Sequence, residues 1–218
     1  MPVSAGSASG VKAAPLGYDR VYVKLDAPFS YDSWFKALKA GRSMATNGPM
    51  LFLTVDGKEP GDVLRVAPGR YRTLAVHAEV SSGKPLDRLE VVFNGKTIRT
   101  VRGARDLKMD FEVEAAPGWF AARAFEKPDR TVRFAHTSPV YVEVPGRSAP
   151  VPEEDAQFFI RWIDREMNFY RAASGFRDPA HRSEMLALFA AARSVYTKIA
   201  AANREDTSAA TGQERKTN

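Results

Sequence analysis

The stretch Leu89–Val101, LEVVFNGKTIRTV, decides the fold class, because two runs rich in apolar residues flank the dipeptide Asn94-Gly95. Asn-Gly between such runs is a strong short-range signal for a β-hairpin, since both residues tolerate the positive φ angles of a tight turn. The same period of two extends from Met50 to Val144 in short runs separated by Gly, Pro and Asp. About seven short strands without intervening helices predict an antiparallel β-sandwich over residues 50–145.

A different pattern precedes this region. The segment Arg20–Leu25 alternates like a strand, and Ser30 is a suitable N-cap for a helix that should end before Gly41. Residues 1–49 are therefore expected to form a separate N-terminal part made of a loop, a strand and a helix.

A third pattern follows the linker at Pro145–Pro150. Apolar residues recur at three- and four-residue steps, Ser174-Gly175 interrupts them, and Asp178-Pro179 opens a second helical run. Residues 146–203 are expected to form an antiparallel helical hairpin, and residues 204–218, which lack large apolar side chains, a disordered tail. The expected fold class is thus α+β.

Composition excludes several classes of function. The 218 residues include no cysteine, which removes disulfides, thiolate metal sites and cysteine nucleophiles. The histidines, His77, His136 and His181, lie too far apart for local zinc signatures. The net charge of +6 is spread along the chain, so no basic stripe predicts binding to nucleic acid. No signal peptide and no membrane-spanning run is recognisable, and no membrane partner is expected.

Three unusual strings contain the candidate site residues. GRSMATNGP carries Arg42 and Asn47, PGWFAAR carries Arg123, and AHTSPVY carries His136. These residues either form a shared polar pocket near the first helix, or bond backbone carbonyls at the end of a sheet. A Ser–His–Asp arrangement using Ser138 and His136 lacks the sequence context that exposes a nucleophile.

The succession PLGYDRVYVKL, YDSWFKALKAGRSMATNGPMLFLTVDGKEPGD, VVFNGK, GWFAARAF and AHTSPVYV resembles the C-terminal portion of CehA/McbA-type metallohydrolases of the PHP superfamily. In that family a distorted β/α barrel carries N-terminal histidine and carboxylate motifs that hold two or three divalent metals. The resemblance implies that residues 1–49 are the last strand and helix of such a barrel, followed by a β-sandwich and helices.

None of the family's metal-binding motifs has a counterpart in this chain, so the resemblance implies no metal ligand and no cofactor here. Tyr18-Asp19-Arg20 also stands where the family tends to have Tyr-Asn-Arg. The chain is interpreted as a truncated reading frame or half of a split protein. It would be a non-catalytic accessory module whose partner is a PHP-type catalytic domain, in cis or in trans. It is cytoplasmic as it stands, or exported if a missing part carries a signal.

Further expectations stay open beside this one. Val21, Val23, Trp34 and Phe35 would lack their barrel neighbours, which predicts self-association. The main alternative is a free-standing β-sandwich that binds carbohydrate or another surface ligand through exposed aromatic residues such as Trp119 or Tyr141. The third hypothesis is that the chain is a small hydrolase that uses His136 without a metal.

Overall fold

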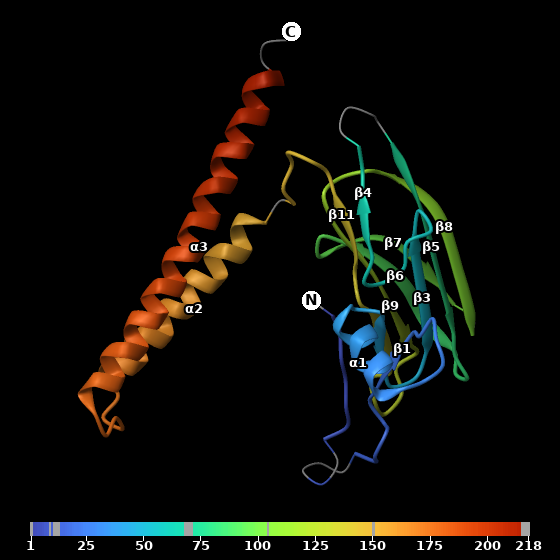
Figure 1. Cartoon of the computed structure of the whole chain (residues 1–218), viewed down its shortest axis with the longest axis horizontal. Helices are drawn as coiled ribbons and strands as arrows, with labels where there is room; N and C mark the ends of the chain where they lie inside the picture. Colours follow the sequence, from blue (N-terminus) through green and yellow to red (C-terminus); the bar gives the residue numbers. More distant parts are fainter. Residues whose placement is uncertain are drawn as a thin grey trace. The chain divides into compact units, whose positions relative to one another are not determined.

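The computed structural model describes residues 2–8, 10, 14–67, 72–103, 105–149 and 151–214, with side chains as far as Ala202. The chain forms two compact units, Met1–Ala149 and Pro150–Asn218. The elements, shown in Figure 1, are β1 (Arg20–Val23), α1 (Tyr31–Lys39), β2 (Ser43–Thr46), β3 (Met50–Val55), β4 (Val63–Arg65), β5 (Thr73–Ser81), β6 (Leu86–Phe93), β7 (Lys96–Arg102), β8 (Asp106–Glu114), β9 (Gly118–Glu126), β10 (Phe134–Thr137), β11 (Val140–Glu143), α2 (Glu153–Ala172) and α3 (Pro179–Glu214).

The first unit is built from two sheets. The larger has eight strands, and β9 is central in it: β6 pairs with one edge of β9, while β10 and β11 pair one after the other with its opposite edge. The sheet continues from β10 through β2 to β1, from β11 to β4, and from β6 to β7. The smaller sheet has the order β3-β5-β8.

The two sheets enclose one apolar core, so the α+β sandwich expected from the sequence is confirmed. Alternate residues of each strand point inward, as a strand period of two requires. Fully buried side chains from both sheets include Leu51, Leu53, Leu74, Leu89, Val91 and Phe120. Burial of each such side chain contributes about 1.5–3 kcal/mol.

The hairpin predicted at Asn94-Gly95 is present. Asn94 has φ 48° and Gly95 has φ 83°, the positive values that a two-residue turn between β6 and β7 requires. The Asn94 side chain also reaches the start of β9, because its Nδ2 donates to the Pro117 carbonyl (3.2 Å) and its Oδ1 accepts from the Trp119 N–H (3.0 Å). Gly118, with φ 154°, lies against this amide, and a Cβ there would overlap it.

The N-terminal part is not set apart from the sandwich as expected. β2 pairs with β1 on one edge and with β10 on the other, and all three belong to the eight-stranded sheet. The sequence pattern missed β2, because turn-forming residues follow it directly at Asn47-Gly48-Pro49. It also missed β4, whose pairing with β11 is parallel, whereas a purely antiparallel sandwich was expected.

Helix α1 begins where the sequence predicts. The Ser30 side chain accepts a hydrogen bond from the Ser33 N–H (3.1 Å), and the Ser33 hydroxyl accepts one from the Ser30 N–H (3.0 Å), which together form a capping box. The helix ends at Lys39, and Gly41, with φ 83°, lets the chain turn into β2.

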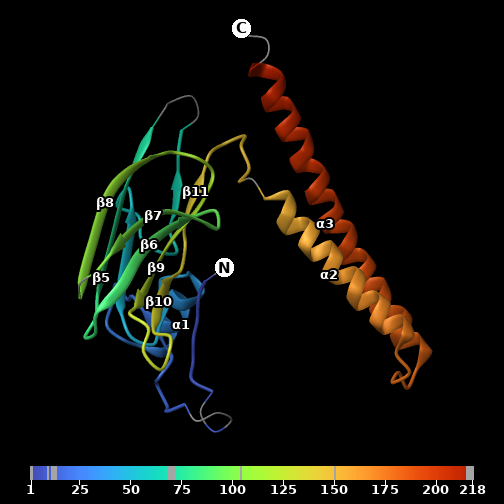
Figure 2. The same cartoon turned by 180° about the vertical axis from the view of Figure 1, so that it is seen from behind.

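The second unit is the expected antiparallel hairpin, and Figure 2 shows α2 and α3 side by side. Helix α3 extends to Glu214, so it covers much of the region 204–218 for which a disordered tail was expected; residues 215–218 lie outside the described part. Within the described residues, one segment, Pro179–Ala202, is long and apolar enough to cross a membrane by length and composition. Only 6% of the most apolar 18-residue stretch of this segment is buried within the described structure.

Candidate functional site

The outer face of the eight-stranded sheet carries a charged cluster centred on Glu90. Register places Glu90 of β6 beside Arg123 of β9, and Arg123 beside His136 of β10. The Arg123 Nε donates to one carboxylate oxygen of Glu90, and the Arg88 Nε donates to the other (2.7 Å). Arg123 also donates to the Thr97 hydroxyl (3.0 Å). Glu90 thus lies between two guanidinium groups.

Two opposing effects set the pKa of Glu90. Burial is the larger single influence and raises the pKa, since the side chain is only 10% exposed. The hydrogen bonds from Arg88 and Arg123 and their positive charges together outweigh burial, so the pKa of Glu90 lies below its ordinary value. The carboxylate is therefore ionised at neutral pH.

The four residues singled out in the sequence do not form one pocket. Arg123 and His136 are register neighbours on adjacent strands, but their side chains bond to different groups. His136 Nδ1 lies 2.7 Å from the carbonyl of Thr137, whereas Arg123 Nε donates a hydrogen bond to Glu90. Arg42 pairs with Asp26 and Asp62, beside the end of α1.

Asn47 holds the beginning of β10 in place. Its Oδ1 accepts from the Phe134 N–H (2.8 Å), and its Nδ2 donates to the Val132 carbonyl (3.2 Å). The neighbouring Gly48 has no room for a side chain, because a Cβ would lie 2.6 Å from Glu126 Oε1. The string GRSMATNGP is thus accounted for by bonds within the chain.

A groove of about 840 Å³ opens elsewhere on the same outer face. Trp119 of β9 and Tyr141 of β11 are register partners, and both point away from the core, since their neighbours Phe120 and Val142 are buried in it. Arg65 of β4 also lines the groove and pairs with Glu143 at 3.1 Å. Two aromatic rings beside a charged pair can bind a ligand that has both apolar and polar faces.

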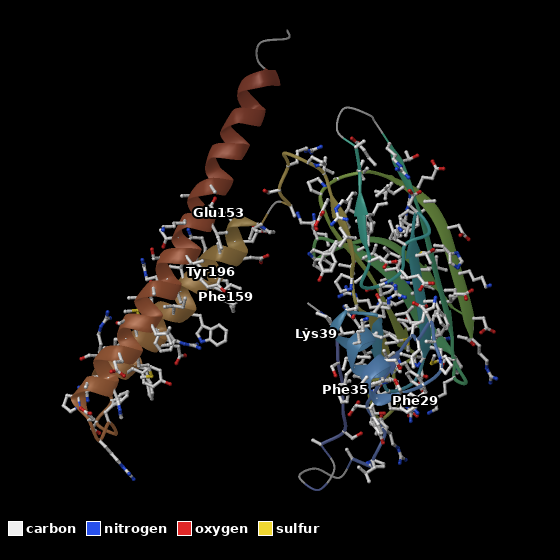
Figure 3. The ribbon with its side chains drawn as sticks, in the orientation of Figure 1. Phe29, Phe35, Lys39, Glu153, Phe159 and Tyr196 are labelled. Atoms are coloured by element: carbon white, nitrogen blue, oxygen red, sulfur yellow. The ribbon has the colours of Figure 1, made fainter. Side chains whose placement is uncertain are left out.

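An aromatic patch surrounds α1. Phe29 is 68% exposed, Tyr31 77% and Phe35 60%. The rings of Phe29 and Tyr31 contact each other edge to face, with centroids 5.8 Å apart, as do those of Trp34 and Phe35 at 5.0 Å. Figure 3 labels Phe29 and Phe35. We define Phe29, Tyr31, Trp34 and Phe35 as the α1 patch.

A smaller cavity of about 350 Å³ lies between the two sheets, lined by residues of β1, β2 and β3. Tyr22 and Met44 line it from the larger sheet, and Phe52 lines it from the smaller one. The cavity is mainly apolar, and β1, the strand that ends the larger sheet, contributes Tyr22 and Val23 to it.

The described residues do not fit the divalent metals that the resembled family holds in its barrel. Among these residues, no group of three or more His, Asp and Glu side chains is placed to hold a metal ion. His77 directs Nδ1 to Asp110 (2.7 Å), His136 bonds to the backbone, and His181 is exposed on α3. We therefore derive no step through a metal.

The Glu90 cluster was missed in the sequence, and the α1 patch was predicted only at Trp34 and Phe35, although signals for both existed. Arg88 and Glu90 alternate with buried residues in LDRLEVVF, which places both on the outer face of β6, and only the register of β9 shows that Arg123 joins them. The density of aromatic residues in FSYDSWF, from Phe29 to Phe35, indicates more rings than one nine-residue helix can bury.

The comparisons with known proteins identify no family. No family model matches the chain, and no curated protein matches it. Two solved structures of the CARDB domain of the PF1109 protein from Pyrococcus furiosus match 43% and 44% of this chain and 94% of theirs. The solution NMR structure is 18% identical, the crystal structure in complex with di-metal ions is 20% identical, and both have a TM-score of 0.26. A likeness at this level carries no argument about the site.

Proposed function

We propose that the first unit is a non-catalytic accessory module that docks to a PHP-type metallohydrolase domain through the α1 patch. The single observation that carries the proposal is the exposure of Phe29, Tyr31 and Phe35 on the strand–helix segment that resembles the end of such a barrel. Contiguous exposed apolar surface is typical of an interaction site.

The position of the α1 patch favours this partner. Among the described strands, β1 is the terminal strand of the larger sheet and pairs with β2, so its other edge has no strand partner there. α1 contacts this strand. A partner with a strand edge and apolar helices could cover both features at once. Aromatic residues are also enriched among those that carry most of the energy of protein interfaces.

The docking test supplies a PHP-type barrel domain, expressed without its own C-terminal region, in trans. The full chain should co-purify with it, and Phe35→Asp should weaken the complex at least about tenfold, because a charge replaces a large apolar contact. Val132→Asp is the control, since Val132 is also an exposed apolar residue of the first unit, 70% against 60%, but lies outside the α1 patch. Equal binding by the two variants would contradict the proposed docking surface.

A second measurement tests the non-catalytic part of the proposal. Zinc, manganese and iron are titrated into the isolated chain by calorimetry while phosphoester, carbamate and amide substrates are assayed. We expect no stoichiometric binding tighter than micromolar and no metal-dependent turnover. Such binding, with turnover lost in His136→Ala, would place a catalytic site in this chain.

The groove on the outer face favours a second candidate function, binding of a carbohydrate or a similar surface ligand. Its support is the pair formed by Trp119 and Tyr141, which present neighbouring rings beside Arg65 and Glu143. Titration with soluble oligosaccharides, monitored by tryptophan fluorescence, tests it. Trp119→Ala should abolish the signal, and Trp34→Phe, in the α1 patch, should keep it.

A further inference from the structure

We propose that two copies of this chain associate through one apolar face of the helical hairpin. We define this hairpin face by the residues Phe158, Phe159, Trp162, Phe169, Tyr170, Leu188, Val195 and Tyr196. It belongs to the second unit, so the inference does not rest on the function proposed for the first.

A chain of aromatic contacts makes this face continuous across both helices. Phe158 contacts Trp162 on α2, with ring centroids 6.1 Å apart, and Trp162 stacks on Phe159 at 6.3 Å. Phe159 in turn stacks on Tyr196 of α3 at 4.8 Å, as Figure 3 shows for these two labelled rings. The apolar surface therefore extends from the outer side of α2 onto α3.

A second set of rings repeats the arrangement three helical turns away. Phe169 contacts Tyr170 at 5.2 Å, and Tyr170 stacks on Phe189 of α3 at 5.7 Å. Because Phe159 and Tyr170 are eleven residues apart, they lie on the same side of α2. Both sets of rings thus belong to one face.

Helix α3 widens this face. Leu188 and Val195 are seven residues apart and so share one side of the helix. Leu188 directly precedes Phe189, and Val195 directly precedes Tyr196. Because successive residues of a helix are turned by about 100°, Leu188 and Val195 point further from α2 than these two rings do. Leu188 is 71% exposed and Val195 55%.

The opposite face of the hairpin is polar. Arg193 of α3 donates from Nε and Nη2 to the two carboxylate oxygens of Asp164 on α2, at 2.7 and 3.2 Å. This bond and the positive charge of Arg193 hold the pKa of Asp164 below its ordinary value. The other face is mainly apolar and includes one carboxylate, Glu166, which accepts a hydrogen bond from Trp162 Nε1 (3.1 Å). A hairpin with these two faces requires a partner on the mainly apolar side only.

The exposed area suits a second copy. Phe158, Trp162 and Phe169 are 53%, 46% and 64% exposed, which for rings of about 200 Å² leaves roughly 330 Å² of aromatic surface in water. Leu188 and Val195 raise this to about 500 Å² per chain, so two copies would together bury about 1,000 Å², the size at which specific interfaces begin. Two hairpins joined this way form a four-helix arrangement.

A lipid bilayer suits the same face less well. The segment Pro179–Ala202 is long and apolar enough to span one, but it contains Arg193 and Lys198, and Arg193 is bonded to Asp164. Residues 146–218 carry 11 Lys and Arg against 10 Asp and Glu, and a net charge of only +1 gives the unit little attraction to anionic lipids.

The first test measures the mass of the full chain by sedimentation over a range of concentrations. We expect a dimer, and the double variant Leu188→Glu/Val195→Glu should dissociate at least about tenfold more readily. Ala190→Glu is the control: Ala190 is exposed on the same helix but is turned toward the flank of Arg193. A wild-type chain that stays monomeric at every concentration would overturn the proposal.

The second test does not depend on charged substitutions. Because the chain has no cysteine, a spin label can be attached to Val195→Cys alone, with Ala190→Cys as control. Dimer formation should immobilise the label at position 195 and leave the one at 190 mobile. Equal mobility at both positions would refute the proposed face, and immobilisation only on adding phosphatidylcholine or phosphatidylserine vesicles would identify lipid as the occupant.

Discussion

Replacing Glu90 by glutamine should lower the free energy of unfolding of the first unit by about 2–3 kcal/mol at pH 7. The carboxylate accepts hydrogen bonds from Arg88 and Arg123, one on each oxygen, and its side chain is 10% exposed. Glutamine has nearly the same size, so the packing of β6 is kept while the charge is removed.

The magnitude follows from the two bonds. A hydrogen bond to a charged group contributes about 1.5–3 kcal/mol. The glutamine oxygen can accept from one arginine, but the amide nitrogen faces the other guanidinium as a second donor, so about one such bond is lost. The arginine side chains are 28% and 36% exposed and can turn to water, which keeps the loss below the 3–5 kcal/mol of a fully buried broken pair.

The effect has a defined pH dependence. Because the pKa of Glu90 in the folded state lies below its ordinary value of 4.5, the folded state holds the proton less well than the unfolded chain. The stabilisation by ionised Glu90 is thus complete above about pH 4.5 and is lost as pH falls through the folded pKa. The difference between the wild-type chain and Glu90→Gln should shrink over that acidic range.

Urea unfolding measures this difference in a Trp162→Phe background, where Trp34 and Trp119 report on the first unit alone. Glu112→Gln, at an exposed position of β8, is the matched control and should change stability by less than about 0.5 kcal/mol. If Glu90→Gln costs no more than this control, or if its cost stays constant from pH 7 to acid, the account of the cluster is refuted.

Two further substitutions test contacts that fix the strands. Gly118→Ala should destabilise the first unit by about 2 kcal/mol or more, because a side chain is strained at φ 154° and its Cβ would overlap the Asn94 amide. Urea unfolding should show a smaller loss when the same substitution is made in an Asn94→Gly background. Asn47→Ala should cost about 1–3 kcal/mol in the same assay, since Phe134 and Val132 lose their partners, whereas Asn47→Asp keeps the acceptor for Phe134 and should cost less.

Sequence patterns predicted those elements whose signal is local. The Asn94-Gly95 turn, the Ser30 cap and the apolar steps of α2 are each specified by residues within a few positions, and all three are in the structure. Strands β2 and β4 are short, four and three residues, and owe their existence to distant partners, β10 and β11. No local pattern specifies such a pairing.

The same distinction between local and distant determinants applies to the candidate site residues. The unusual strings around Arg42, Asn47, Arg123 and His136 were recognisable. The bonding partners of Arg42, Asn47 and Arg123 were not, because they lie on other strands or loops, whereas His136 bonds to the carbonyl of its neighbour Thr137. Register places Arg123 between Glu90 and His136, and its Nε donates to Glu90. A one-residue shift of β9 would turn Arg123 to the core, so the sequence alone could not assign its role.

The central place of β9 has a consequence for how the protein is made. Thr46 of β2 pairs with Ala135 of β10, 89 positions later in the chain, so β1 and β2 leave the ribosome long before their sheet exists. At about 5–20 residues per second that interval lasts roughly 4–18 seconds. During it, β2 can pair only with β1, and its other edge is open to foreign strands. Nascent chains of this protein should therefore be most vulnerable to aggregation until β9 and β10 have been synthesised.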